Sequence, residues 1–247
     1  MLCFIHIGKT GGTTIDNILK KSINKYKQYH MGKKYKPDEK YIIWVRNPLS
    51  RFVSAFNMEH YFITFDYKNK KLSEINDKTC MWPDHIRDVK LKNPEYIIDP
   101  VYDRLIKFFD SPNKLAEGLT DPDPNIKNKA LRLMNFKNKG HIFRGIGWYL
   151  NNGDLVKNNN NKILFVGRQE SMKRDIEKLN IILDNKLKPS NDKMVNKFSP
   201  EESKYLSPLA IANLIEFYKN TDYAALIELK NHGWIDEEVL ESYYKYP

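Results

Sequence analysis

The sequence predicts an α/β fold, in which a central parallel sheet is flanked by helices in three layers. Three short apolar runs support this prediction: Cys3–Ile7, Tyr41–Val45 and Ile163–Val166. Each run is rich in β-branched or aromatic residues and ends at a polar turn, after which apolar residues recur at helical spacing. Strands and helices that alternate in this way form right-handed βαβ units on a parallel sheet. Because the carboxyl ends of parallel strands meet at one edge, we expect these turns to form one site.

The first turn, Gly8–Thr14, has the composition of an anion-binding loop. Its glycines allow the backbone to approach a ligand closely, and a helix is predicted to begin near Thr13. The free amides and the positive dipole end of a helix N-terminus attract an anion. Lys9 adds a full positive charge, and the threonines add hydroxyl donors. The residues expected to hold a phosphate-containing ligand here are Lys9, Thr10, Gly11, Gly12, Thr13 and Thr14.

A nucleoside-triphosphate P-loop is the first alternative for this turn. That motif requires a glycine, then four residues, and then Gly-Lys-Ser/Thr. In this chain no glycine lies five positions before Gly8, and Gly11 and Gly12 follow the lysine instead of preceding it. The order of residues therefore argues against an ATP-dependent kinase or other P-loop phosphotransferase, which stays open as an alternative function.

The second turn follows the strand Tyr41–Val45, where Arg46 precedes an Asn-Pro pair typical of a helix start. In the predicted helix, Arg51 and Ser54 are three positions apart and share one face. An arginine fork together with a hydroxyl group suits the recognition of a phosphate monoester. The second turn therefore predicts a second phosphate-binding motif, at the same edge of the sheet as the first.

These motifs resemble those of sulfotransferases that use 3′-phosphoadenosine 5′-phosphosulfate (PAPS). The segment His6–Thr14 is similar to the loop of that family that binds the 5′-phosphosulfate. Trp44–Phe56 resembles its 3′-phosphate motif, and Phe165–Glu170 resembles a later segment that follows the last core strand. The resemblance is closest to the branch that sulfates carbohydrates, such as the heparan-sulfate 2-O and 6-O enzymes. It is firm over residues 1–57, fair over residues 163–230 and absent between them.

The resemblance implies a P-loop-like fold and an enzyme that moves a sulfuryl group from PAPS to a hydroxyl group of a sugar or polysaccharide. It implies that Arg46 and Ser54 hold the 3′-phosphate, with Arg168 as a further cofactor contact and Arg51 less certain. Lys9 is expected to neutralise the charge on the leaving oxygen. No metal is expected, since the chain lacks a Cys/His cluster with the spacing of a zinc site.

Transfer to a hydroxyl group also requires a general base, usually His or Glu. Of the six histidines, His30 is the first choice because it follows a predicted second strand and lies between the two phosphate motifs, as a histidine does in related carbohydrate enzymes. His60 and Glu59, just beyond the second motif, are the alternatives. A family member that binds the nucleotide without turnover also remains open.

The length of 247 residues and the apolar content of 41% are sufficient for a substantial core. We expect one sulfotransferase domain over residues 1–247, with a helical and loop insertion over about 61–140 that is rich in proline. The asparagine-rich stretch Asn151–Lys162 is expected to be an exposed loop. The sequence does not indicate the oligomeric state.

The formal net charge of +10, from 41 basic and 31 acidic residues, permits a polyanionic partner. A non-catalytic protein that binds nucleotides or nucleic acid is therefore a further alternative, although no nucleic-acid-binding motif is present and no such partner is expected. There are two cysteines, no apolar run near the ~20 residues of a membrane span and no signal-peptide pattern. These features lead us to expect a cytoplasmic protein.

Overall fold

The computed structural model describes residues 1–29, 36, 38–64, 99–137, 140–188 and 204–247. In this part of the chain, four strands form a sheet in the order β2-β1-β3-β4, and every pairing is parallel. The strands are β1 (Leu2–Ile5), β2 (Tyr26–Tyr29), β3 (Lys40–Val45) and β4 (Ile163–Arg168). The predicted parallel α/β sheet is therefore confirmed.

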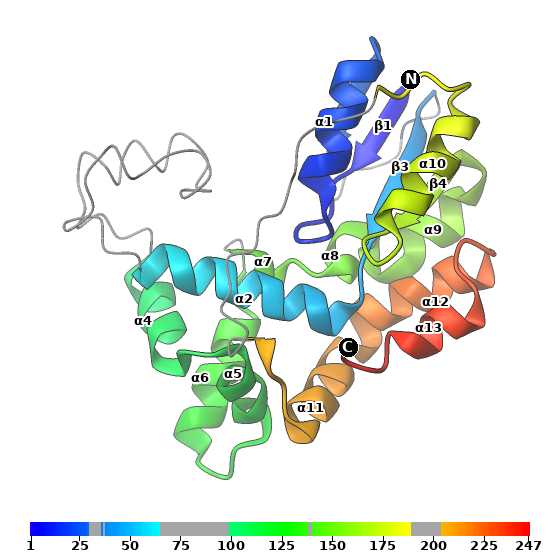
Figure 1. The fold of residues 1–247 in the computed structure, drawn as a ribbon. Helices are drawn as coiled ribbons and strands as arrows, with labels where there is room; N and C mark the ends of the chain where they lie inside the picture. Colours follow the sequence, from blue (N-terminus) through cyan, green and yellow to red (C-terminus); the bar gives the residue numbers. More distant parts are fainter. Residues whose placement is uncertain (30–35, 37, 65–98, 138–139, 189–203) are drawn as a thin grey trace, which may run out of the picture.

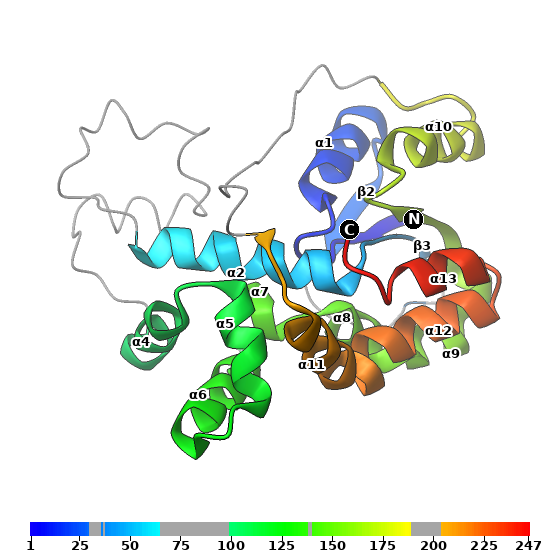
Figure 2. The ribbon, with the colours of Figure 1, turned by 60° about the horizontal axis from the view of Figure 1, so that its bottom comes forward.

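Helices cover both faces of the sheet and produce three layers (Figure 2). Alternate residues of a strand point to opposite faces. Phe4, Ile42 and Trp44 belong to the small core beneath two helices, whereas Cys3 and Ile43 belong to the larger core on the other face. The helices over the small core are α1 (Gly12–Ser22) and α10 (Met172–Ile182). Those on the other face are α8 (Ile146–Leu150), α9 (Asp154–Asn159) and α12 (Ala224–Asn231). Burial on both faces explains why the strands read as continuous apolar runs.

Helix α2 (Pro48–Thr64) leaves the carboxyl end of β3 and extends beyond the sheet (Figure 1). Several short helices pack beneath it: α4 (Pro100–Phe109), α5 (Pro112–Glu117), the 3-10 turn η2 (Gly118–Thr120) and α6 (Pro124–Met134). Asp99, Ser111 and Asp123 cap three of these helices, and a proline follows each cap. The described residues of the expected insertion are largely helical, while its part at 65–98 lies outside the described residues. That this segment is an insertion into the domain stays a prediction.

The expectation of an exposed loop over Asn151–Lys162 is wrong. This stretch forms helical turns in which Leu155 and Val156 are buried, and the side-chain oxygen of Asn160 accepts a hydrogen bond from Trp234 at 2.6 Å. Asn151 and Asn152 adopt left-handed backbone conformations, which asparagine tolerates, so this stretch begins with a tight turn inside a packed layer. The remaining helices are α7 (Gly140–Phe143), η3 (Asn151–Gly153), η4 (Asn160–Lys162), α11 (Pro208–Tyr218), the π-helix η6 (Lys219–Tyr223) and α13 (Glu237–Ser242).

The edge formed by the carboxyl ends of β1 and β3 determines where the site lies. The chain passes from β1 to β2 on one side and from β3 to β4 on the other, so the strand order reverses between β1 and β3. Ligands of open parallel sheets bind at such a reversal. The turn Gly8–Thr14 follows β1 and Arg46 follows β3, which brings the two phosphate motifs together. In the part of the chain that the structure describes, no helix combines the length and apolar character of a membrane span.

Candidate active site

Residues Ile7–Thr14 form a tight turn between β1 and α1. Lys9 and Gly11 both adopt left-handed backbone conformations, with φ angles of 71° and 81°. Glycine adopts this conformation without strain because it has no Cβ, whereas it is uncommon for a lysine. The amide of Thr14 donates to the carbonyl of Gly11 at 3.1 Å, where α1 begins. The predicted strand, glycine turn and helix N-terminus are thus all present.

The N-terminus of α1 leaves its amides available to a ligand. No side chain caps this 11-residue helix, and no acidic residue lies in its first turn. Thr13 is exposed and Thr14 is half-buried. The hydroxyl of Thr10 is used within the loop, since it is buried and donates to the carbonyl of Ile7 at 2.9 Å. Amides, rather than the Thr10 hydroxyl, are therefore the donors that this turn presents.

Neighbouring rings pack closely on the loop glycines. A Cβ on Gly8 would collide with the His141 ring, and a Cβ on Gly12 would collide with the His6 ring. His6 itself stacks on Phe4, with ring centroids 5.5 Å apart. These glycines are required by close approach of side chains as well as by the turn. His6 directly follows β1, and its ring supports the loop from the side of the sheet.

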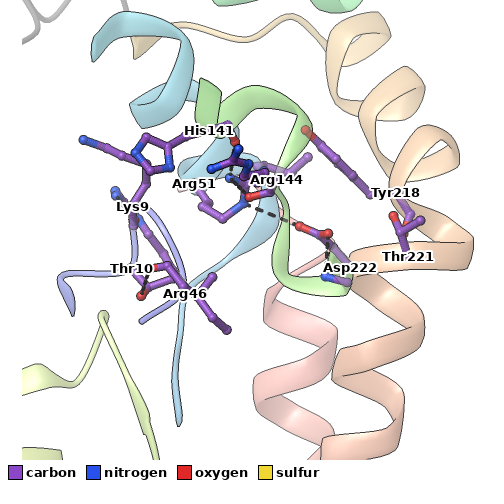
Figure 3. A network of polar contacts seen from close by, with 12 residues as sticks. Lys9, Thr10, Arg46, Arg51, His141, Arg144, Tyr218, Thr221 and Asp222 are labelled. Carbon is purple, nitrogen blue, oxygen red and sulfur yellow. Dashed lines mark hydrogen bonds and ion pairs between the residues drawn. The ribbon is translucent and has the colours of Figure 1, made fainter. Parts of the chain in front are cut away.

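Lys9 lies among other cations (Figure 3). Its Nζ contacts Sδ of Met58 at 3.2 Å, and Nη1 of Arg46 donates to the Lys9 carbonyl at 3.2 Å. Burial, together with the charges of Arg46 and Arg51, lowers the pKa of Lys9 to about 8, although Glu59 acts in the opposite direction. A desolvated lysine beside two arginines favours an anionic ligand, because the negative charge would compensate for the water contacts that the amine has lost.

Arg46 directly follows β3 and projects toward the loop. Its Nε is buried and lacks a hydrogen-bond partner among the described residues. The nearby carboxylate of Glu170 is occupied by neutral donors, since it accepts from the amide of Asn47 at 2.8 Å and from the hydroxyl of Tyr243 at 2.9 Å. The side chain of Asn47 caps α2 as predicted, by accepting from the amides two and three residues further on. The guanidinium of Arg46 is thus left for a further acceptor.

Helix α2 presents different residues to the loop and to the protein interior. Ser54 and Met58 are one turn apart on the same side of the helix, both are half-buried, and Met58 contacts the amine of Lys9. Arg51 is 0% exposed and its guanidinium points inward. Ser54 therefore stays a candidate for phosphate binding, whereas Arg51 is engaged within the protein.

Arg51 is the centre of a buried network that joins α2, α7, α8 and η6 (Figure 3). Its Nη1 donates to the carbonyls of His141 at 2.9 Å and Arg144 at 3.3 Å. Its Nε lies 3.5 Å from Oδ2 of Asp222, while Oδ1 of Asp222 accepts from the amide of Gly147 at 2.9 Å. Sequence reasoning missed these partners because they lie far along the chain and belong to no motif.

Arg168 ends β4, at the same edge of the sheet as Arg46. Its amide donates to Oδ2 of Asp175 at 2.9 Å, and its Nε lies 3.9 Å from the same oxygen. The carboxylate of Asp175 therefore balances part of its charge and ties it to α10. Its role as a cofactor contact stays a prediction.

The structure describes two of the three candidate bases, His60 and Glu59. His30 directly follows β2 but lies outside the described residues, so its role as the base stays a prediction. His60 is half-buried on α2 and stacks on Phe56 with ring centroids 5.7 Å apart, and burial lowers its pKa. Neither observation selects His60 over His30.

Glu59 is engaged in holding a neighbouring segment. It is 6% exposed and accepts from the amides of His141 and Ile142 and from the hydroxyl of Tyr102. Burial raises the pKa of Glu59 to about 7 despite the amide hydrogen bonds. Three donors occupy its carboxylate, which makes it a poorer candidate for accepting a substrate proton.

We predict that Asp222→Ala strongly destabilises the protein, because Arg51 would keep a buried charge without its carboxylate. The expected loss in the free energy of unfolding is about 3–5 kcal/mol, measured by urea denaturation. Glu216→Ala is the control, since its ion pair with Lys219 is exposed and contributes less than about 1 kcal/mol. Equal stability of the two variants would contradict the importance of the buried pair.

Comparison with known proteins agrees with this geometry. A profile of the sulfotransferase family matches residues 1–223, which include the Gly8–Thr14 loop, Arg46 and the segment after β4. No curated protein and no solved structure matches the chain significantly. Because the family match covers most of its length, this chain belongs to the sulfotransferase family.

Proposed function

We propose that this sulfotransferase uses PAPS as its donor and transfers the sulfuryl group to a hydroxyl group of a carbohydrate. The observation that supports this most directly is the pair of cationic motifs at neighbouring strand ends, joined by the hydrogen bond from Arg46 to the Lys9 carbonyl at 3.2 Å. PAPS carries anionic groups at two separate positions of its ribose. Two adjacent anion sites, rather than one, match this donor.

The groups present at the site fit such a ligand. We assign the 5′-phosphosulfate to Lys9, the Thr10 backbone and the amides of Gly11–Thr14, because α1 begins without a cap. We assign the 3′-phosphate to Arg46 and Ser54, since Nε of Arg46 is buried and has no hydrogen-bond partner within the described residues. Among those residues, no three His, Cys, Asp or Glu side chains gather in a way that could hold a metal ion.

The proposed reaction uses positioning and electrostatics. PAPS supplies an activated sulfuryl group, so that the acceptor oxygen bonds to sulfur while the bond from sulfur to the bridging phosphate oxygen breaks. Lys9 neutralises the negative charge that develops on the leaving oxygen. His30 takes the proton of the acceptor hydroxyl group. The loop amides keep the reacting groups in line, which removes much of the entropic cost of the encounter.

The carbohydrate acceptor rests on the resemblance of His6–Thr14 and Trp44–Phe56 to the carbohydrate branch of the family. It is tested by incubating the protein with radiolabelled PAPS and a panel of desulfated polysaccharides, tyrosine peptides and small phenols. Label incorporated only into peptides or phenols would overturn the carbohydrate assignment while leaving the donor assignment intact.

We predict that the reaction product PAP (3′-phosphoadenosine 5′-phosphate) stabilises the protein without added metal. At one hundred times its dissociation constant, the apparent melting temperature should rise by about 5–10 °C. ATP with Mg²⁺ should produce little change, because the loop lacks the residue order of a triphosphate-binding P-loop. Stabilisation by ATP–Mg²⁺ that a chelator abolishes would favour a kinase, and stabilisation only by nucleic acid would favour the non-catalytic alternative.

We predict that Arg46→Ala weakens PAP binding more than Ser54→Ala. A charge-assisted contact contributes roughly 1.5–3 kcal/mol, against ~1 kcal/mol for a neutral hydroxyl group, so the expected losses are about 10–150-fold and about 5-fold. Isothermal titration measures both. Arg174→Ala, exposed on α10, and Thr64→Ala, at the end of α2, are the matched controls. Unchanged affinity in a folded Arg46→Ala variant would refute the assignment.

We predict a bell-shaped pH dependence of kcat/KM for PAPS. Lys9 must be protonated to act on the leaving group, and its lowered pKa of about 8 means that it loses its proton above that pH. The rate should therefore fall about tenfold per pH unit above 8. His30 must be neutral, so the rate should also fall below about 6.5, the unperturbed pKa of histidine.

Variants separate the two limbs of this profile. Lys9→Arg keeps its charge at all these pH values and should lose the alkaline limb. His30→Ala should lose the acid limb and reduce turnover by ~10²–10⁴-fold, with PAP affinity preserved. Near-normal turnover of His30→Ala would place the base elsewhere, with His60 and Glu59 the next residues to substitute.

A further inference from the structure

The imidazole ring of His141 packs against the loop that carries Lys9. A Cβ on Gly8 would collide with Nδ1 of His141 and would lie 2.8 Å from its Cε1. Gly8 directly precedes Lys9, and the ring of His141 lies near the side chain of Lys9, whose charge acts on it (Figure 3). The backbone of Gly8 also faces the hydroxyl of Tyr149, where it acts against the burial that raises the pKa of that tyrosine. The chain from α7 to α8 therefore forms one wall of the loop.

Two charged residues of α2 hold the backbone of His141 at both of its polar groups. Nη1 of Arg51 donates to the His141 carbonyl at 2.9 Å, and the carboxylate of Glu59 accepts from the His141 amide. Both side chains are buried, with 0% and 6% of their surface exposed. Buried charges are costly unless they are compensated. Here the charged groups of Arg51 and Glu59 both hydrogen-bond to the backbone of His141, which leaves its imidazole little freedom to move away from the loop.

The chemical character of His141 suits a place beside a cation. Its Nδ1 is buried and has no hydrogen-bond partner within the described residues. Burial and the charges of Lys9, Arg51, His6 and Arg144 lower the pKa of His141 to about 3, so the ring is neutral at ordinary pH. A carboxylate at this position would pair with Lys9, and a cation would repel it. A neutral ring does neither and leaves the charge of the lysine for an anionic ligand.

We propose that His141 is a positioning residue, whose neutral ring fixes the Gly8–Lys9 segment so that the amine of Lys9 stays desolvated and directed at the donor. The inference rests on the catalytic role proposed for Lys9. Within the described residues, the charged groups that act on Lys9 are Arg46 after β3 and Arg51 and Glu59 on α2. The three atoms nearest to a Cβ on Gly8 all belong to the His141 ring, so removal of this side chain is expected to open the loop to water.

The test measures Lys9 directly and needs neither donor nor acceptor. The protein is acetylated with limiting reagent over a range of pH, and the labelling of Lys9 is followed by mass spectrometry. In the wild type, the pH at which the labelling of Lys9 is half-maximal should lie near 8. In His141→Ala it should move toward the unperturbed lysine value of about 10.4, because water reaches the amine. A midpoint unchanged from wild type in folded His141→Ala would overturn the proposal.

Kinetics provide the second measurement. His141→Ala should reduce kcat by up to about 10²-fold, the cost of a displaced catalytic group, while PAP affinity changes less than about 3-fold. His141→Asn restores a polar atom near the position of Nδ1 and should recover most of the lost rate. The His141→Asn variant also serves if His141→Ala does not fold. If its pH midpoint of Lys9 labelling moved fully to the unperturbed lysine value, the proposal would be contradicted.

Two further variants serve as controls. His232→Ala removes a histidine whose Nε2 lies 3.8 Å from the Glu228 carboxylate, and it should change neither the pH midpoint of Lys9 labelling nor kcat. Gly8→Ala should weaken PAP binding strongly when His141 is present, and less in the His141→Ala background, where the collision is removed. Equal losses in both backgrounds would mean that the ring does not pack on Gly8. If the wild type bound no PAP, the proposed function would fail, while the labelling result would still decide the contact between His141 and the loop.

Discussion

The buried charge of Arg51 is the interaction on which the geometry of the site depends. Its side chain is fully buried, and it is balanced by Asp222 at 3.5 Å and by two carbonyls in and after α7. An unpaired charge in this position would cost several kcal/mol, so α2, α7 and η6 must keep one relative arrangement. Because α2 starts at the end of β3, this arrangement also determines where Arg46 and Ser54 stand relative to the loop.

Around this network, the site contains backbone and side-chain arrangements that are unfavourable in themselves. Lys9 combines a positive φ angle with a desolvated amine, and Arg46 has a buried nitrogen without a hydrogen-bond partner in the described part of the chain. Such departures reduce stability and are tolerated at functional sites, where the packing around them is strong enough to hold them. An anionic ligand would offset them, which agrees with membership of the sulfotransferase family.

The sequence was most informative where short-range patterns control the structure. Tyr41–Val45 is a strand because its residues are β-branched and aromatic, and Asn47 ends it by capping the next helix. The stretch Asn151–Lys162 shows where this reasoning fails. Its composition indicates an exposed loop, but Leu155 and Val156 are buried in the core. Composition describes the average behaviour of a residue type, and a packed layer can override it.

The sequence by itself determined the three strand-to-helix junctions, and with them the loop of Lys9, the position of Arg46 and the family to which they point. Glycines, caps and strand propensities act within a few residues, so a local pattern is sufficient to predict them. Only the tertiary structure decided that Arg51 faces inward and that His141 reaches Gly8. Arg51 and the carbonyl that it contacts are 90 residues apart, and contacts over such separations depend on how the layers pack, which leaves no local pattern in the sequence.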